Sequence, residues 1–142
     1  MFAKILHAND GSEAAFHAFG FALALAKQNQ SELHIVCVEE LPFFSDFIEE
    51  VEQTMEAAAR RFERVLERAQ DLAGGQGLKL NTHVFAGHPV RDIVKLAADL
   101  KADLVVIGAK GHSELYERMI GSRADRIIQL AQCPVLVVKW RG

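Results

Sequence analysis

Short apolar runs alternate along this chain with longer stretches in which apolar and polar residues recur at helical spacing. The apolar runs have the length of strands, and glycine, proline, asparagine or aspartate bounds most of them. Five strands are therefore predicted, at residues 3–8, 33–38, 78–85, 103–107 and 134–139. In the third run apolar and polar residues alternate, as in a strand with one better-buried face.

Amphipathic segments separate the predicted strands. The first begins at Ser12, which is a suitable N-cap, and the second is a long helix over residues 45–72 that the glycine pair starting at Gly74 would end. The third has Pro89 in its first position, and the fourth covers residues 122–131. Because strand and helix alternate throughout, the pattern predicts a parallel α/β sheet with right-handed crossovers and helices on both faces.

The segment after the fourth predicted strand has the outline of a phosphate-binding loop. Gly108 follows the strand, Gly111 comes next in the motif, and Gly121 with Ser122 opens the last predicted helix. Glycines tolerate positive φ and let backbone amides approach an anion, and the first turn of a helix offers unpaired N–H groups. The spacing is neither the Walker pattern nor the dinucleotide fingerprint. Tight turns without a ligand are the alternative interpretation.

With the spacing G-x2-G-x9-G-S, the chain resembles the ATP-binding branch of the universal stress protein family. The resemblance extends over nearly the whole chain, through K-I-L-H-A-N-D-G-S-E, E-L-H-I-V-C-V and A-G-H-P to the C-terminal C-P-V-L-V-V-K. It implies one domain over residues 1–142, with a Rossmann-like, doubly wound five-stranded parallel sheet in the order 3-2-1-4-5. Ligands of such sheets bind where the strand order reverses, so the expected crevice lies between strands one and four.

The resemblance also implies which residues line this crevice. Main-chain groups at Val38 would hydrogen-bond adenine, and Arg123 could neutralise phosphate charge. Asp10 would contact the nucleotide or hold Mg²⁺ against its phosphates, although its position also suits a cap for the following helix. The expected nucleotide-binding set is Ala8, Asn9, Asp10, Val38, Ile107, Gly108, Gly111, His112, Gly121, Ser122 and Arg123.

Three positions depart from the family pattern. Ala109 stands where a hydroxyl residue is frequent, Cys37 where histidine is frequent, and Arg123 where a small aliphatic residue is usual. Loss of a hydroxyl near the phosphates is expected to affect affinity rather than binding itself, and the charge of Arg123 could compensate.

Composition and charge narrow the functional classes. The chain has 142 residues, 50% hydrophobic and 25% charged, with a formal net charge of −3, which supplies no general attraction for nucleic acid or an anionic membrane. It shows neither an apolar run of transmembrane length nor a signal-peptide pattern, which predicts a cytoplasmic location. Its six histidines form no zinc motif, and Ser122 has no hydrolase signature beside it. Cys37 and Cys133 are expected to be reduced core residues.

These observations predict a regulatory stress-response protein that holds ATP, or AMP, with Mg²⁺ in the crevice. Backbone amides recognise phosphate without distinguishing these nucleotides. No general base is evident, so turnover is expected to be slow or absent. One alternative is a slow ATPase in which Asp10 or His112 positions water, and another is a structural dimerisation module whose crevice stays empty.

A homodimer is expected through the last strand, residues 134–139, which begins with Pro134 and ends with Lys139. In the implied order this strand lies at a sheet edge, yet it carries the uninterrupted run V-L-V-V, and such edges readily pair with another strand. Antiparallel pairing about a two-fold axis would also bury Trp140 against the partner. The alternative is that the long helix, residues 45–72, folds over this edge.

Overall fold

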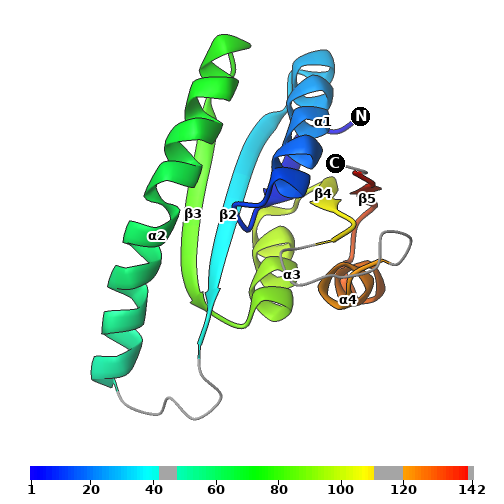
Figure 1. Ribbon diagram of the computed structural model, residues 1–142. Coiled ribbons are helices and arrows are strands. Elements are labelled where there is room, and N and C mark those ends of the chain that lie inside the picture. The colour runs from blue at the N-terminus through cyan, green and yellow to red at the C-terminus, as the bar shows by residue number, and fades with distance from the viewer. Residues whose placement is uncertain (42–47, 111–119, 141–142) are drawn as a thin grey trace.

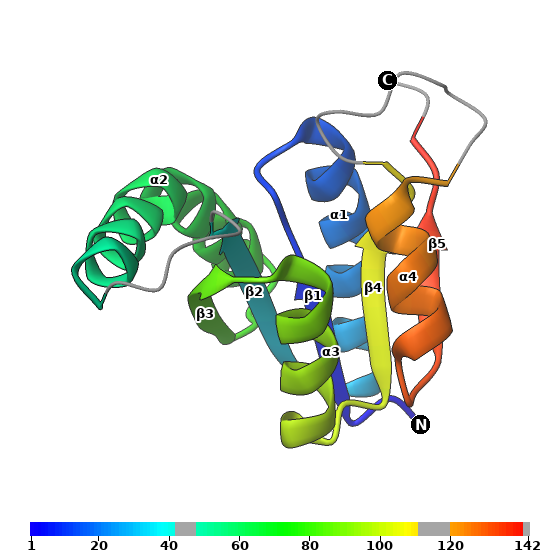
Figure 2. The ribbon, with the colours of Figure 1, turned by 90° about the horizontal axis from the view of Figure 1, so that it is seen from below.

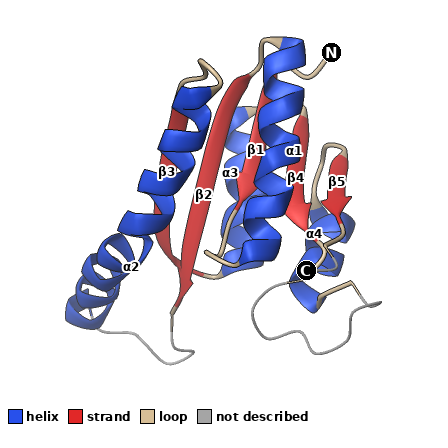
Figure 3. Cartoon of the chain, turned by 45° about the horizontal axis from the view of Figure 1, so that its top comes forward, coloured by secondary structure: helices blue, strands red, loops and turns tan. Residues whose placement is uncertain are grey.

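Five parallel strands form one sheet in the computed structural model, which describes residues 1–41, 48–110 and 120–140. The strand order is β3-β2-β1-β4-β5 (Figure 1, with all five strands labelled in Figure 3), and each neighbouring pair is parallel. This confirms the expected fold class and strand order. The strands are β1 (Lys4–Ala8), β2 (Glu32–Glu40), β3 (Leu80–Gly87), β4 (Leu104–Gly108) and β5 (Val135–Val138).

Helices cover both faces of the sheet, and Figure 3 shows α1 in front of it and α3 behind. Successive strand residues point to opposite faces, so Leu33 and Ile35 pack with α1 and α2, whereas Val36 packs with α3 and α4. The helices are α1 (Glu13–Asn29), α2 (Ile48–Gly75), α3 (Pro89–Leu100) and α4 (Ser122–Leu130). No helix within the described ranges combines the length and apolar character needed to cross a bilayer.

The first helix begins where the sequence predicts. Ser12 Oγ accepts a hydrogen bond from Ala15 N–H at 3.1 Å and so caps the first turn. The apolar residues that recur at helical spacing in this segment are buried against the sheet, namely Ala15, Phe19, Ala22, Leu23 and Ala26. The small alanine side chains allow the helix to lie close to the strands beneath it.

Helix α2 ends at a different glycine from the one that the sequence predicts. Gly74 and Gly75 lie in the last turn of the helix rather than ending it, and the stop is Gly77, which has a φ of +71°. Leu78 N–H donates to Ala73 O at 2.9 Å, and Gly77 N–H donates to Gly74 O at 3.0 Å, which is the Schellman arrangement. The helix therefore ends at the glycine that takes a left-handed conformation, not at the first glycine in the sequence.

Helical spacing of apolar residues predicts one buried face for α2, but only part of this face is buried. Phe62 and Ala69 pack against the sheet, whereas Met55, which is 48% exposed, and Ala59 face solvent. The N-terminal part of α2 extends past the edge of the sheet (Figure 1, Figure 2). The helix packs on β2 and β3, at the opposite end of the sheet from β5. The alternative in which it covers the β5 edge is therefore wrong.

Strand β2 extends two residues past its predicted end. Its pairing with β3 continues until Glu40 lies opposite Gly87, and Leu41 N–H donates to Gly87 O at 2.9 Å. The pattern predicts an end at residue 38 because Glu39 and Glu40 follow the apolar run, but hydrogen bonds to β3 outweigh the low strand propensity of glutamate. Strand β3 correspondingly lies two residues later than predicted. The extension carries two carboxylates beyond the end of β1, whose last residue, Ala8, lies opposite residue 36.

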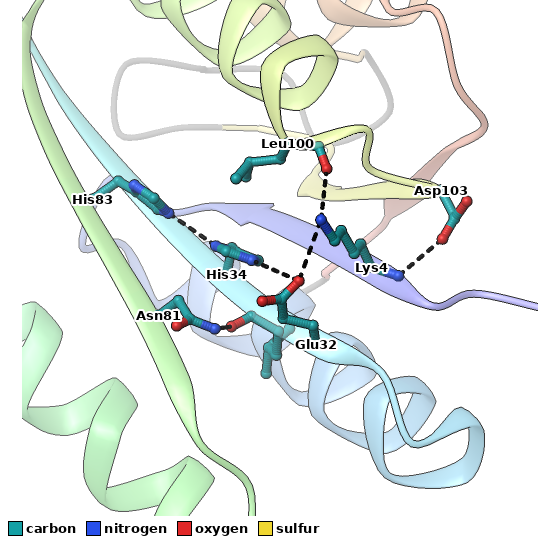
Figure 4. A network of polar contacts seen from close by, with 8 residues as sticks. Lys4, Glu32, His34, Asn81, His83, Leu100 and Asp103 are labelled. Atoms are coloured by element: carbon teal, nitrogen blue, oxygen red, sulfur yellow. Dashed lines mark hydrogen bonds and ion pairs between the residues drawn. The ribbon is translucent and has the colours of Figure 1, made fainter.

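A polar network joins the starts of β1 and β2 to the end of α3 (Figure 4). Lys4 Nζ donates to Leu100 O at 3.1 Å and lies 3.6 Å from Glu32 Oε2. The buried His34 has its Nδ1 2.9 Å from His83 Nε2, and its Nε2 lies 3.5 Å from Glu32 Oε2, which is too long for a good hydrogen bond. The network connects β1, β2, β3 and α3 toward the end of the sheet where the strands begin.

Candidate functional site

A cavity of about 390 Å³ opens at the carboxyl ends of the strands, at the β1–β4 boundary where the strand order reverses. Its volume is in the range usual for small-molecule sites. Nine residues of the expected nucleotide-binding set line it, namely Ala8, Asn9, Asp10, Val38, Ile107, Gly108, Gly121, Ser122 and Arg123. The other two, Gly111 and His112, lie outside the described residues. The fold thus brings together segments that are far apart in sequence.

The start of α4 presents backbone donors at this cavity, including the predicted Ser122 amide but not the Gly121 amide. Gly121 is the N-cap, and its N–H already donates to Ala109 O at 2.6 Å. Ser122, Arg123 and Ala124 occupy the first turn, where helical geometry provides no partner for the N–H groups. These three amides and the positive end of the helix dipole form a surface suited to an anion.

The motif suggests positive φ at its glycines, but the two that the structure describes, Gly108 and Gly121, do not adopt it. Gly121 has a φ of −61°, and Gly108 is also outside the left-handed region. Among the described glycines, positive φ occurs at Gly77 and at Gly11, where φ is +88°. Gly11 forms the turn after β1, and a Cβ there would lie 3.1 Å from Val65 Cγ2 of α2. Among the described residues near the cavity, the left-handed glycine therefore lies in the turn after β1.

Asp10 supports that turn and keeps capacity for a ligand. Its Oδ1 accepts a hydrogen bond from Ser12 N–H at 2.9 Å, close to what the helix-cap alternative expects, although the N-cap itself is Ser12. An ionised carboxylate has about four lone-pair sites on its two oxygens. One hydrogen bond therefore leaves acceptor positions on a side chain that lines the cavity.

A chain of buried hydrogen bonds beneath the turn positions Asn9. His7 Nδ1 lies 2.9 Å from Val106 O, and Asn9 Nδ2 lies 3.1 Å from His7 Nε2. Because the carbonyl can only accept, Nδ1 carries the proton, and Nε2 accepts from the Asn9 amide. Asn9 Oδ1 in turn accepts from Gly11 N–H at 2.7 Å. The side chain of Asn9 is thus committed to holding the turn, although the residue also lines the cavity.

This chain requires neutral His7, so stability should depend on pH. Burial lowers the pKa of His7 to about 4, against the raising effects of its hydrogen bond to Val106 and of the charge of Asp10. In the unfolded chain the pKa is about 6.5, so the unfolded state takes up the proton first as pH falls. We expect a contribution of about 3 kcal/mol to the free energy of unfolding that is complete above pH 6.5 and is lost progressively between pH 6.5 and 4. Denaturant unfolding at several pH values measures it.

The variant His7→Asn isolates this effect from the titration of carboxylates. The stability difference between wild type and His7→Asn should shrink as pH falls from 7 to 5, because only in wild type does the unfolded state gain a proton at residue 7 that the folded state does not bind. The exposed His17 of α1 provides a matched control, and His17→Asn should show no such pH-dependent difference. A wild-type advantage over His7→Asn that stays constant across this pH range would contradict the prediction.

Charged residues from several elements surround the cavity. β2 contributes Glu39 and Glu40, α2 contributes Arg61, and α4 contributes Arg123. Glu39 forms an ion pair with Arg61, and Arg123 Nη2 donates to Glu40 Oε2 at 2.9 Å. Lys110, after β4, also lines the cavity. No local signal marks the two glutamates as site residues, because only the pairing of β2 with β3 carries them there.

Apolar residues of the helices complete the wall and were also missed, because their spacing identifies them only as core. They are Ala15, Phe62, Pro89, Ile93, Ala124 and Ile127. Of the departures from the family pattern, Ala109 lines the cavity and adds no hydroxyl there. Cys37 is instead buried in the core with Ala58 and Phe62, and burial raises the pKa of its thiol to about 12.

The sequence of this chain matches known proteins over nearly its full length. A family model described as the universal stress protein family matches residues 1–139. A universal stress protein of Methanocaldococcus jannaschii is 33% identical over 141 residues, which cover 98% of this chain and 83% of that protein. The universal stress protein YxiE of Bacillus subtilis is 33% identical over 151 residues, which cover 98% of this chain and 100% of that protein.

Solved structures share the fold. Universal stress protein UspA from Lactobacillus plantarum has a TM-score of 0.86 at 24% identity, covering 97% of this chain and 98% of its own. A universal stress protein in complex with cAMP has a TM-score of 0.75 at 23% identity, covering 96% and 97%. One from Archaeoglobus fulgidus in complex with dAMP has a TM-score of 0.62 at 21% identity, covering 98% of each chain. The family model and the relatives in sequence, together with this fold, show that the chain belongs to the universal stress protein family.

Proposed function

We propose that this chain binds an adenine nucleotide, ATP or AMP, in the cavity between β1 and β4, as one nucleotide-binding unit over residues 1–142. The observation that carries the proposal is that the open amides at the start of α4 border the same cavity as apolar walls from β1, β2 and β4. A nucleotide joins an anionic phosphate to a flat, largely apolar base, so it matches a site with one donor-rich end and one apolar end. The complexes of structural neighbours with cAMP and dAMP support the same ligand class.

The main chain of Val38 supports an adenine position at the end of β2. Asn9 N–H donates to Val36 O, so the backbone groups of Val36 point toward β1. The backbone groups of Val38, two residues later, point to the same side, but β1 has ended at Ala8. The edge of a base has both donors and acceptors and would pair with these groups, which otherwise depend on water. Ala8 and Ile107 provide apolar walls beside them.

The proposal includes Mg²⁺ bound through the phosphates. Mg²⁺ commonly keeps several waters and is held by one or two carboxylates together with substrate phosphates. Asp10 supplies such a carboxylate in the cavity, with acceptor capacity left after its bond to Ser12. Over the described ranges, no three His, Cys, Asp or Glu side chains are grouped as metal ligands. We therefore assign Asp10 as the protein ligand of a phosphate-bound ion.

Asp10→Asn is expected to weaken ATP binding several-fold in the presence of magnesium and less in the presence of a chelator. The substitution removes the charge that holds the ion but keeps an Oδ1 that can accept from Ser12 N–H, so the turn should survive. Calorimetric titration under both conditions measures the two effects. If affinity is unchanged and only the melting temperature moves, Asp10 serves the turn and not the ligand.

We further propose that the protein acts in the cytoplasm as a regulatory homodimer joined through β5. The free thiols of Cys37 and Cys133 fit a reducing compartment. Strand β5 forms one edge of the sheet, beside β4, and α2 packs near the opposite edge, on β2 and β3. A second copy paired along β5 would satisfy the open backbone groups of this edge. We assign a binding and regulatory role rather than an enzymatic one.

The nucleotide that survives purification tests the proposed function most directly. The purified protein is denatured, and ion-pair chromatography of the supernatant identifies any bound nucleotide. We expect ATP or AMP, and titration of the emptied protein should show that adenosine binds more weakly than either. Absence of any adenine nucleotide, with no binding of ATP or AMP at millimolar concentration, would overturn the proposal in favour of the structural dimerisation module.

A further inference from the structure

An ion pair connects two elements at the cavity. Arg123 Nη2 donates to Glu40 Oε2 at 2.9 Å, although the two residues are 83 positions apart in sequence. Glu40 is the last residue of β2, and Arg123 is the second residue of α4. Both line the cavity, and more than half of each side chain is exposed to solvent. The pair therefore lies where an entering ligand meets it.

The place of Arg123 in its helix points to a role in the cavity. A cation near the N-terminus of a helix is unfavourable, because the helix dipole is positive there. The N–H of Arg123 is also one of the open amides of the first turn. A guanidinium beside such amides would add charge-assisted hydrogen bonds to a phosphate. In the absence of a ligand, Glu40 compensates this concentration of positive charge.

The charges of the described lining residues balance. Asp10, Glu39 and Glu40 are acidic, and Arg61, Lys110 and Arg123 are basic. Each glutamate is paired with an arginine from a different helix. A phosphate at the start of α4 would therefore have to share Arg123 with Glu40. The attraction lost by this sharing increases with the number of charges on the phosphate group.

We propose that Glu40 is a specificity-determining residue that limits the phosphate charge accepted by the cavity, through its hold on Arg123. This inference rests on the proposed nucleotide site and states which phosphate charge that site prefers. In this arrangement the attraction between ATP and Arg123 adds less to the binding free energy than the charge of ATP would allow. A nucleotide with a single phosphate loses less affinity in the same way. An exposed ion pair contributes little to stability, so its removal should leave the fold intact.

Titrations of wild type and Glu40→Gln with adenosine, AMP and ATP test this selectivity. A chelator is present throughout, so that Mg²⁺ does not mask the charge of the ligand. Glu40→Gln should bind ATP roughly tenfold more tightly and AMP roughly threefold more tightly, with adenosine unchanged. In an Arg123→Gln background, the gain for ATP should fall to about twofold or less, because the arginine is no longer there to be released.

A matched control distinguishes the loss of the Glu40–Arg123 ion pair from the loss of a negative charge elsewhere on the protein. Asp99 of α3 forms an ion pair with Lys95 at 3.2 Å and does not line the cavity, so Asp99→Asn removes the same charge elsewhere. We expect no change in ATP affinity for this variant. An equal gain for adenosine and ATP, an equal gain in Asp99→Asn, or a gain that persists undiminished without Arg123 would each overturn the proposal.

Inorganic tripolyphosphate distinguishes failure of this inference from failure of the proposed function. If Glu40→Gln binds tripolyphosphate more tightly than wild type but no adenosine compound binds, charge selection stands and the nucleotide proposal fails. If nucleotides bind wild type and Glu40→Gln equally, the nucleotide proposal stands and charge selection fails. If neither tripolyphosphate nor any nucleotide binds either protein, both fail.

Discussion

Gly121→Val is expected to abolish measurable ATP binding while the protein remains folded. Gly121 is buried, lines the cavity and directly precedes the three open amides of α4. Its φ of −61° and ψ of 153° are accessible to valine, so the backbone is not the obstacle. The added side chain has to find room at a buried position beside the proposed phosphate site. Valine is also a poorer N-cap than glycine, at a cost of about 1 kcal/mol.

The same substitution on the surface is the control for Gly121→Val. Gly20 of α1 is exposed, and a Cβ there would have no heavy atom within 4 Å, so Gly20→Val should bind ATP like wild type. Circular dichroism and a melting curve establish that both variants are folded before calorimetric titration. Gly121→Ala provides a milder version if the valine variant does not fold, and it should bind ATP more weakly than wild type. A folded Gly121→Val with wild-type affinity would rule out a phosphate site at the start of α4.

Val137→Pro is expected to convert a wild-type homodimer into a monomer. Val105 N–H donates to Pro134 O, and Ala109 N–H donates to Val138 O, so the even-numbered residues of β5 direct their carbonyl groups to β4. The backbone groups of Val137 therefore point to the open edge. Proline removes the N–H that a second copy would pair with, and proline is tolerated at a strand edge.

Light scattering after size exclusion measures the change in mass. Wild type should show twice the chain mass of 15.7 kDa, and Val137→Pro should show a mass near 15.7 kDa. Val137→Thr is the control, because it keeps the N–H and the branched side chain and should remain dimeric. Fluorescence of Trp140, which is 43% exposed in the single chain, should shift to longer wavelength when the dimer separates. A monomeric wild type at tens of micromolar, or a folded dimer of Val137→Pro, would place the interface elsewhere or exclude it.

Element type and order were accessible from the sequence because they depend on local periodicity. The apolar runs that became β1 and β4 could be recognised without any partner, and Ser12 was recognisable as an N-cap from its own chemistry. Boundaries were less accessible where a neighbouring element decides them. Glu39 and Glu40 are strand residues only because β3 provides hydrogen bonds, and Met55 is exposed only because α2 extends past the edge of the sheet.

For the candidate site, too, the sequence predicted some features and could not predict others. The positions of Asp10, Gly121 and Ser122 followed from a motif, and the fold brings these positions to one cavity. Their roles did not all follow, because a glycine in a motif does not reveal which hydrogen bond its amide already makes. Gly121 N–H is occupied by Ala109, so the open donors begin one residue later. The ion pair between Glu40 and Arg123 could not be predicted, since no spacing rule relates residues 83 positions apart.

The sequence by itself determined the alternation of strands and helices, because this depends on residue types at short, fixed separations, and its resemblance to a known family implied which chain segments meet at the switch point. The tertiary structure decided which amides remain open, how far β2 extends, which charges meet across the cavity and that His7 is held neutral beneath the turn. These properties depend on distances between segments remote in sequence, and on exclusion of water from a buried imidazole. Such distances exist only once the strands have paired and the helices have packed on them.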